Sequence, residues 1–210
     1  MKILALSDTL VPFLYSPQVR NRFPEVKLLI GCGDLPYYYL EYVYDALCVP
    51  LYFVRGNHDE VVEYGSAGQR THPHGGIDLH RKACSCQGLL LAGLEGSLRY
   101  RPGVFQYSQS EMWSQVLGLA PRFLLNRKLH GRYLDIFVAH APPAGIHDGQ
   151  DLPHQGIKAF RWLIEVFKPA YFLHGHIHIH RPDIPIKTVV GRTSVINTFG
   201  FREVDIELDQ

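Results

Sequence analysis

The stretch Gly56-Asn57-His58-Asp59-Glu60 follows directly on the apolar run Leu51-Tyr52-Phe53-Val54. The run predicts a buried strand, and the glycine lets the backbone turn out of the sheet where that strand ends. An amide, an imidazole and a carboxylate in consecutive positions at a strand end indicate a metal site, because such side chains supply oxygen and nitrogen ligands to divalent ions. A solvated turn uses the same residue types, so the interpretation depends on similar junctions elsewhere in the chain.

Four other junctions have this form. The polar residues that follow short apolar runs are Asp8 after 3–6, Gly33-Asp34 after 28–30, His140 after 135–139 and Gly175-His176-Ile177-His178 after 171–173. Between the strands at 28–30 and 51–54, a helical spacing of apolar residues follows Pro36 and comprises Leu40, Val43, Tyr44 and Leu47. Strands joined by such a helix are parallel, and their carboxyl ends lie at one edge of a sheet. We therefore expect an α/β fold that brings these distant residues together.

Two further helices and one strand are expected as scaffold. Residues 88–93 carry a run of leucines that predicts a strand. Ser108 and Glu111 have the spacing of a capping box, so a helix begins there. An amphipathic helix is expected from Gly156 and ends before Pro169, which cannot continue it.

The remaining segments differ in pattern. Residues 61–80 are rich in Gly, His and Pro, which predicts a loop whose histidines His72, His74 and His80 are exposed. Residues 187–197 and 203–208 alternate branched apolar with polar side chains. This alternation predicts a closing antiparallel pair of strands with Gly200 at the turn.

Length, charge and cysteine content limit the class of protein. The 210 residues are enough for one domain, 1–210, with a sizeable core. A net charge of +1 gives no broad basic surface, so nucleic acid and anionic lipid are disfavoured as partners. The first apolar run is too short for a secretory signal, and no later stretch reaches membrane length. Four cysteines without paired spacing predict reduced, buried thiols, and we expect a cytoplasmic protein.

The strand-end residues form a mixed set of possible metal ligands, namely Asp8, Asp34, Asn57, His140, His176 and His178. Taken singly, such an aspartate is usually a cap and such a histidine a buried hydrogen-bonded residue. Together they suit Mn, Fe, Ni or Zn and are enough for two ions. Two ions roughly 3.5–4 Å apart, bridged by a carboxylate and a hydroxide, would supply a nucleophile for hydrolysis of a small phosphoester.

The order of these motifs resembles the calcineurin-like metallophosphoesterase superfamily over residues 8 to 178. The resemblance implies a four-layer αββα sandwich of two mixed β-sheets flanked by helices, with a two-metal site at the strand carboxyl ends. Segments 33–40 and 96–100 are similar to a bacterial phosphohydrolase branch of the superfamily.

The resemblance also implies a role for each residue of the motifs. Asp34 would bridge both ions, Asp8 and His178 would serve the first ion, and Asn57, His140 and His176 would serve the second. His58 would protonate the leaving oxygen or steady the phosphate, and Asp59 would orient His58. The substrate cannot be carried over, and no substrate-binding residue is assigned.

One position departs from the family pattern. The family opens with Asp-x-His, but here Asp8-Thr9 is followed by Leu10. We therefore expect the ion on the Asp8 side to bind more weakly, and an enzyme with one ion is the alternative. In a further alternative, Leu10 packs in the core and a loop histidine supplies the missing imidazole.

Other interpretations of the function and of single residues stay open. A catalytically weak or inactive protein of this fold could act as a binding or scaffold module, and a nuclease is disfavoured by the balanced charge. Arg55, Arg99 and Arg181 are candidate phosphate clamps, although solvation of surface arginines explains them equally well. The segment 147–154 could cover the site through Asp148 or His154, although an ordinary loop is favoured.

Overall fold

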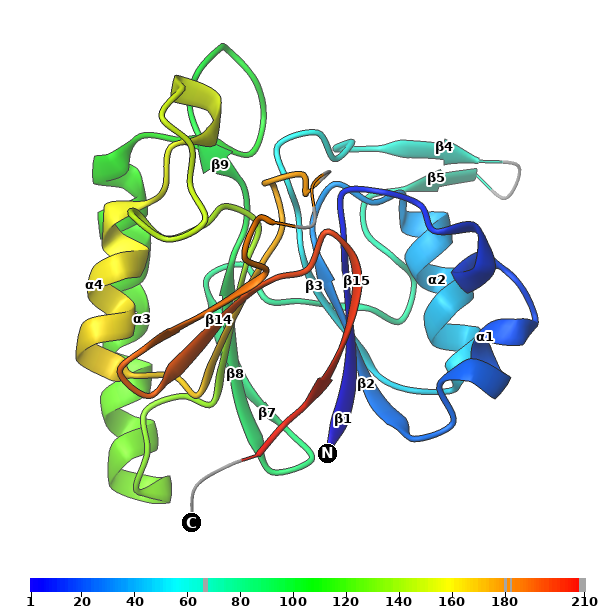
Figure 1. Ribbon diagram of the computed structural model, residues 1–210, viewed down its shortest axis with the longest axis horizontal. Coiled ribbons are helices and arrows are strands. Elements are labelled where there is room, and N and C mark those ends of the chain that lie inside the picture. The colour runs from blue at the N-terminus through cyan, green and yellow to red at the C-terminus, as the bar shows by residue number, and fades with distance from the viewer. Residues whose placement is uncertain (66–67, 180, 182, 208–210) are drawn as a thin grey trace.

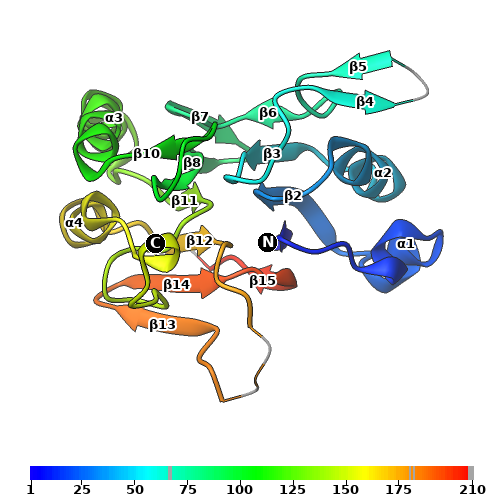
Figure 2. The ribbon, with the colours of Figure 1, turned by 90° about the horizontal axis from the view of Figure 1, so that it is seen from above.

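The computed structural model describes residues 1–65, 68–179, 181 and 183–207. Its main elements form four layers, with two β-sheets face to face and helices on the outer side of each (Figures 1 and 2). This arrangement confirms the expected αββα sandwich of two mixed sheets. No helix in the part of the chain that the structure describes is long and apolar enough to cross a membrane.

The first sheet has the strand order β15-β1-β2-β3-β6. Its strands are β1 (Lys2–Ser7), β2 (Val26–Cys32), β3 (Leu51–Val54), β6 (Ile77–Asp78) and β15 (Gly200–Asp205). All neighbours are parallel except β15, which runs antiparallel to β1. The outer face is covered by η1 (Pro12–Tyr15), α1 (Gln18–Arg22) and α2 (Tyr37–Leu47).

The second sheet has the strand order β13-β14-β12-β11-β8-β7. Its strands are β7 (Lys82–Cys86), β8 (Leu89–Leu94), β11 (Ile136–Ala139), β12 (Tyr171–His174), β13 (Lys187–Val190) and β14 (Thr193–Asn197). The four central strands are parallel, and β7 and β13 are antiparallel edges. The outer face is covered by α3 (Gln109–His130) and α4 (Lys158–Phe167).

Strand β1 shows why the layers stack in this way. Ile3 and Ala5 belong to the apolar core between the two sheets, whereas Leu4 and Leu6 belong to the core under α1 and α2. Successive side chains of a strand point to opposite faces, so a strand with apolar residues at every position needs cover on both sides. Full burial of one such leucine or isoleucine contributes about 1.5–3 kcal/mol.

The helices begin largely as their sequences indicate. The Ser108 hydroxyl accepts a hydrogen bond from the Glu111 backbone N–H at 3.2 Å, and the Glu111 carboxylate accepts one from the Ser108 N–H at 2.6 Å, which completes the capping box of α3. Helix α3 then continues through Pro121 to His130. Helix α4 begins at Lys158 and not at Gly156, because Gly156 belongs to the loop before it.

The closing antiparallel pair expected from 187–197 and 203–208 is wrong. Strands β13 and β14 both lie within 187–197 and form a hairpin with each other. Strand β15 instead crosses to the first sheet, where it pairs with β1 from Lys2↔Asp205 to Ser7↔Gly200. Its Val204 packs between the sheets, a destination that the alternating pattern alone does not define. Leu208 lies outside the described residues.

Two other expectations need correction. Residues 61–80 are not only a loop, because they contain β4 (Glu63–Gly65), β5 (Gly68–Arg70) and β6. Strands β4 and β5 form a small hairpin above α2 (Figure 1). The cysteines are all free, but only Cys32 and Cys86 are buried. Cys84 is half-buried, and Cys48 is exposed because it follows α2 at the surface.

The last short elements are β9 (Ser97–Leu98) with its parallel partner β10 (Gln106–Tyr107), and η2 (Leu152–His154). Strand β1 runs upward from the N-terminus in Figure 1, so the carboxyl ends of the parallel strands and the loops that follow them lie at the top of that view.

Candidate metal centre

The predicted ligands follow five parallel strands from both sheets. Asp8 follows β1, Asp34 follows β2, Asn57 follows β3, His140 follows β11, and His176 and His178 follow β12. Backbone hydrogen bonds join these strand-end loops in pairs. The Asp8 N–H donates to the Gly33 carbonyl at 3.1 Å, and the Gly175 N–H donates to the His140 carbonyl at 2.9 Å. The topology therefore brings residues 168 positions apart to one edge of the sandwich.

Three possible ligand atoms lie close to a fourth, the His140 Nε2 atom. This atom lies 3.1 Å from Asn57 Oδ1, 3.1 Å from His176 Nδ1 and 3.4 Å from Asp34 Oδ2. Ligand atoms arranged tetrahedrally about 2.0–2.2 Å from an ion lie roughly 3.3–3.6 Å from one another. The donor set of one carboxylate, one amide oxygen and two imidazoles therefore fits a divalent transition metal in both chemistry and spacing.

Hydrogen bonds outside the cluster determine which nitrogen of each histidine faces it. His140 Nδ1 lies 2.9 Å from the Cys32 carbonyl, and His176 Nε2 lies 2.8 Å from the Pro153 carbonyl. Because a carbonyl can only accept, these nitrogens carry the protons. The other nitrogens, His140 Nε2 and His176 Nδ1, are then turned toward the cluster as ligands.

The charges within the cluster are strongly coupled. Burial alone would raise the pKa of Asp34, but the neighbouring His140 and the His58 backbone N–H lower it to about 2. Burial opposes a charge on His140, yet the Asp34 carboxylate outweighs it and raises the pKa of His140 to about 9. Burial and the charge of His140 together lower the pKa of His176 to about 3. Asp34 is thus ionised and His176 neutral, as metal ligands must be, whereas His140 has to lose the proton on Nε2 when an ion binds.

The ligands on the Asp8 side are arranged more loosely. Both Asp8 carboxylate oxygens accept the His176 backbone N–H, at 2.9 and 3.1 Å. His178 Nε2 lies 3.8 Å from Asp8 Oδ1, and the His178 side chain is 51% exposed. Leu10 is 44% exposed, so the alternative in which it packs in the core is wrong.

The loop histidines are engaged elsewhere. His72 contacts Thr71, His74 contacts Glu41, and His80 packs on Tyr107 and lies 3.5 Å from Glu95. His80 is half-buried, which corrects the expectation that it is exposed.

Three of the six candidate ligand residues have strained backbones. Asp8, Asp34 and His176 adopt left-handed conformations with φ of 65°, 56° and 68°. Such conformations cost on the order of 1–3 kcal/mol each and concentrate at functional sites. The neighbouring glycines allow the close approach, because a Cβ atom on Gly56 would overlap the Asp34 carboxylate and one on Gly175 would lie 2.6 Å from Asp8 Oδ2. The fold thus maintains an unfavourable local geometry that positions ligand side chains.

The comparison with known families agrees with this geometry. A family model described as calcineurin-like phosphoesterase matches residues 1–180. This chain belongs to the calcineurin-like phosphoesterase family. No curated protein matches the sequence.

Solved structures share the fold of this calcineurin-like phosphoesterase at low sequence identity. TT1561 of Thermus thermophilus is 16% identical, with a TM-score of 0.64 over 98% of this chain and 99% of that chain. Another crystal structure is 16% identical, with a TM-score of 0.65 over 96% of this chain and 94% of that chain. GAP50, the anchor in the inner membrane complex of Plasmodium, is 12% identical, with a TM-score of 0.50 over 94% of this chain and 70% of that chain.

His58 and Asp59 occupy contrasting positions beside the cluster. The His58 backbone N–H donates to Asp34 Oδ1 at 2.8 Å, and its side chain is exposed. Among the described residues, Asp59 accepts hydrogen bonds from the backbone N–H groups of Asp34, Leu35 and Gly56, at 3.0, 2.9 and 2.6 Å. Asp59 thereby ties together the loops after β2 and β3, and an orienting effect on His58 remains a prediction.

The three candidate arginine clamps are engaged in ion pairs. Arg55 contacts Asp78 at 2.8 Å and Glu95 at 3.3 Å, and donates to the Tyr37 hydroxyl and the Thr71 carbonyl. It therefore holds the end of β3 against its neighbours. The other two pairs, Arg99 with Glu111 and Arg181 with Asp183, lie at the surface. A phosphate contact by any of the three stays a prediction.

The segment 147–154 does reach the cluster, through its backbone. The Pro153 carbonyl accepts from His176, as described above, and His154 lies with its ring centre 5.5 Å from that of His176. Asp148 closes the base of the segment, because its carboxylate accepts the N–H groups of Gly145 and Gly156 at 3.0 and 3.2 Å.

Tyr100 is a residue of the site that sequence reasoning did not assign. Its hydroxyl lies 3.4 Å from Asn57 Nδ2, so it accepts from the amide and turns Asn57 Oδ1 toward His140. Tyr100 belongs to the segment 96–100 that carries part of the family resemblance. No spacing rule connects that segment to Asn57, so the contact had no sequence signal.

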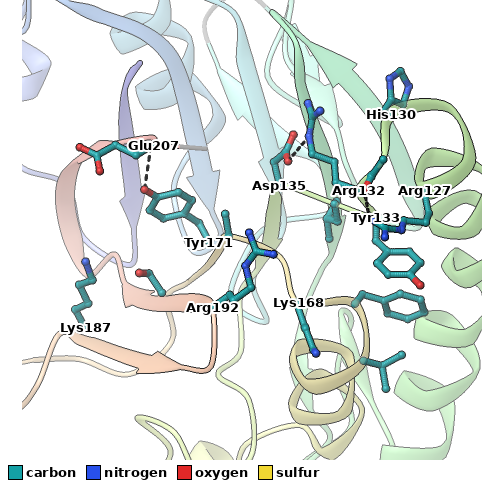
Figure 3. Close-up of a pocket in the computed structure, with 16 residues that line it drawn as sticks. Arg127, His130, Arg132, Tyr133, Asp135, Lys168, Tyr171, Lys187, Arg192 and Glu207 are labelled. Atoms are coloured by element: carbon teal, nitrogen blue, oxygen red, sulfur yellow. Dashed lines mark hydrogen bonds and ion pairs between the residues drawn. The ribbon is translucent and has the colours of Figure 1, made fainter. Parts of the chain in front are cut away.

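One cavity lies away from the metal cluster. It has a volume of about 940 Å³ and is lined from the amino ends of β11 and β12 and the C-terminal ends of α3 and α4. Figure 3 shows Lys168, Lys187 and Arg192 around it. Basic side chains at helix C-termini offset the helix dipole. This effect explains the positions of Arg127 and Lys168 at the ends of α3 and α4, so they do not indicate a bound anion. The candidate metal ligands lie at the opposite edge of the sheets.

Proposed function

We propose that this protein is a metal-dependent phosphoric ester hydrolase acting on a small phosphodiester or phosphomonoester. The observation that supports the proposal is the meeting of Asp34, Asn57, His140 and His176 ligand atoms at about hydrogen-bond distance around one point, with His58 exposed beside them. Divalent ions held at such a site neutralise charge on a phosphoryl group and activate water.

The residues divide into two ligand groups in this proposal. Asp34, Asn57, His140 and His176 hold one ion tightly. Asp8, Asp34 and His178 hold a second ion more weakly, because Leu10 stands where the family has a histidine and because His178 is half exposed. Manganese, iron, nickel or zinc would suit these ligands.

His58 supplies the proton for the leaving oxygen. Its backbone is held by Asp34, while its exposed side chain is accessible to a substrate beside the cluster. A diester is favoured over a monoester, because a single leaving oxygen then needs a proton from a general acid.

The second candidate function is that of a scaffold. It is supported by the likeness to GAP50, which is described as an anchor. A scaffold has no physical need for a buried carboxylate and imidazole cluster on strained backbone, so the enzyme is the better account of this site.

The test is metal analysis of protein purified without chelator, followed by assays of the chelated protein with Mn, Ni, Fe or Zn. Aryl phosphomonoesters, aryl phosphodiesters and cyclic nucleotides are the substrates, and His140→Ala is the control that removes the central ligand. Turnover that depends on added metal and on His140 would support the enzyme. Bound metal without turnover of any substrate would favour the scaffold.

A further inference from the structure

A second, smaller cavity lies beside His58. It has a volume of about 370 Å³. One wall is formed by residues 34–38, which lead from the strand-end loop into α2, and the other by residues 58–60 and Glu63. The cavity shares Asp34 and His58 with the metal site, so it extends from the position where a leaving group would depart.

The N-terminus of α2 borders this cavity but offers no anion site. Free N–H groups at a helix N-terminus normally attract phosphate. Here the Glu63 carboxylate accepts the N–H groups of Tyr37 and Tyr38, at 2.6 and 3.3 Å. Asp59 accepts those of Asp34 and Leu35. The protein's own carboxylates therefore satisfy the donors that a second phosphate would need.

The charge of the lining has one sign. Its acidic residues are Asp34, Asp59, Glu60 and Glu63, and none of the described residues that line it is Lys or Arg. Asp34 is paired with His140, whose Nε2 lies 3.4 Å from Asp34 Oδ2, so the unpaired negative charge of the lining comes from Asp59, Glu60 and Glu63. Arg70 lies 3.8 Å from Glu63 but is shared with Glu41 at 3.2 Å.

The rest of the surface is apolar or aromatic. Leu35 and Pro36 also line the cavity, and Tyr38, another lining residue, is 41% exposed. The Tyr38 ring packs edge-on against Tyr15, with ring centres 5.8 Å apart. A flat apolar group can lie against such a surface, whereas an anion there would meet carboxylates in a site of reduced dielectric.

We propose that this cavity receives the leaving group of the phosphoester, and that the group is an uncharged or cationic alcohol with an apolar or aromatic body. This inference rests on the proposed function. In the reaction, water adds its oxygen to phosphorus and releases a proton to solvent, and the bond from phosphorus to the leaving oxygen breaks. The leaving oxygen takes a proton from His58, which solvent then reprotonates. Leaving groups with a second phosphate or a carboxylate are disfavoured by the acidic lining.

The test uses methyl aryl phosphodiesters whose leaving phenols have matched pKa values and carry a carboxylate, a carboxamide or a trimethylammonium group. With wild-type protein loaded with manganese, kcat/KM for the carboxylate is expected to be about tenfold below that for the carboxamide, because like charges repel across the cavity. The trimethylammonium substrate is expected to be at least as good as the carboxamide. The differences should shrink as salt screens the charges.

Variants of Glu60 test whether the charge of this cavity causes the discrimination between substrates. Glu60 is exposed, and only its backbone carbonyl accepts the Tyr37 hydroxyl, so a change of its side chain should leave the fold intact. Glu60→Gln should reduce the difference in kcat/KM between the carboxamide and the carboxylate substrates. Glu60→Lys should abolish or invert that difference. Glu165→Lys, on the outer helix α4, changes the net charge equally and should leave the discrimination as in wild type.

The outcomes separate this inference from the proposed function. Metal-dependent turnover without discrimination by charge would overturn the inference and leave the function intact. Equal effects of Glu60→Lys and Glu165→Lys would overturn it too, because overall charge would then be the cause. Absence of turnover with every substrate and metal would overturn both.

Discussion

Asn57 and His58, which follow β3, have opposite surroundings. The difference gives Asn57 a place among the metal ligands and leaves His58 available to the substrate. Asn57 is 5% exposed and faces His140, whereas the adjacent His58 is exposed. The two residues lie in the turn after β3, which directs the Asn57 amide into the cluster and leaves the His58 ring at the surface. Asn57 therefore belongs to the buried cluster, and His58 is left to face the substrate.

His58→Ala is expected to retain metal and lose activity. The hydrogen bond from residue 58 to Asp34 comes from the backbone, so alanine preserves it. Loss of the general acid should lower kcat by about 10²–10⁴-fold for alkyl leaving groups and much less for nitrophenol, which leaves without a proton. Metal content by mass spectrometry and kcat for a leaving-group series check this, with the loop variant His72→Ala as control.

Two results would contradict the role of His58. Equal losses for good and poor leaving groups would rule out proton donation. Loss of metal from His58→Ala would mean that its ring binds an ion.

Leu10→His is expected to strengthen the ion on the Asp8 side. Leu10 is 44% exposed, so a histidine there buries nothing and leaves no cavity. Wild-type protein at limiting manganese should bind between one and two ions, and the variant should approach two because one more imidazole is available. Anomalous diffraction at both positions measures the occupancies.

Leu129→His is the matched control, because it places an imidazole at a position 63% exposed on α3. Equal occupancy of two positions in wild-type protein at low metal would show that the Asp8 side needs no additional ligand.

At the scale of elements, the segment from Gly145 to Gly156 acts as a unit over the cluster. Its base is closed by Asp148, and η2 presents the Pro153 carbonyl to His176. The segment has little regular structure, and hydrogen bonds of Asp148, His147 and His154 hold its shape. The Pro153 carbonyl orients the ring of His176, so it influences metal affinity although it does not itself bind the ion.

Asp148→Ala is expected to weaken metal binding although Asp148 touches no ligand atom. Loss of its two hydrogen bonds should destabilise the protein by about 1–3 kcal/mol and, by loosening the hold of Pro153 on His176, lower metal affinity about tenfold. Calorimetric titration with zinc and the free energy of unfolding measure the two effects. Asp183→Ala, which removes an exposed carboxylate, is the control. Reduced stability with unchanged affinity would show that the segment does not hold His176.

At the scale of the whole molecule, the site exists because the two sheets end at the same edge. Asp34 and Asn57 come from the first sheet, and His140 and His176 from the second. The apolar core between the sheets keeps these pairs in register. An ion held by both sheets therefore adds a cross-link between the two halves of the sandwich.

Metal is expected to stabilise the folded protein as a whole. A ligand at one hundred times its Kd that binds only the folded state adds about 2.7 kcal/mol, which for a chain of this size is a rise in Tm of about 5–10 °C. Thermal unfolding of chelated protein with increasing manganese measures the rise. His140→Ala should show little of it. Absence of a rise with Mn, Fe, Ni and Zn would contradict the metal site.

Local sequence was enough to define the strand ends and the residues carried there. Apolar runs followed by Asp8, Asp34, Asn57, His140 and His176 were sufficient to predict where the strands end. An unbroken apolar run indicates a parallel strand buried on both faces, and the carboxyl ends of parallel strands lie at one edge of the sheet. The family resemblance supplied the second sheet, which the structure confirms. It also supplied the division of the ligands between two ions, which stays a prediction.

Contacts between segments far apart in the sequence could not be predicted from local patterns, because they form only in the folded chain. The sequence predicts a strand at 203–208, whereas β15 spans Gly200–Asp205. Its place beside β1 depends on which sheet edge is open and which apolar surface needs cover. Arg55, Asp59 and Tyr100 are polar residues near the motifs whose partners come from loops far along the chain. A side chain's own sequence neighbourhood specifies its chemistry and its face, whereas its partners are specified by the packing of the whole chain.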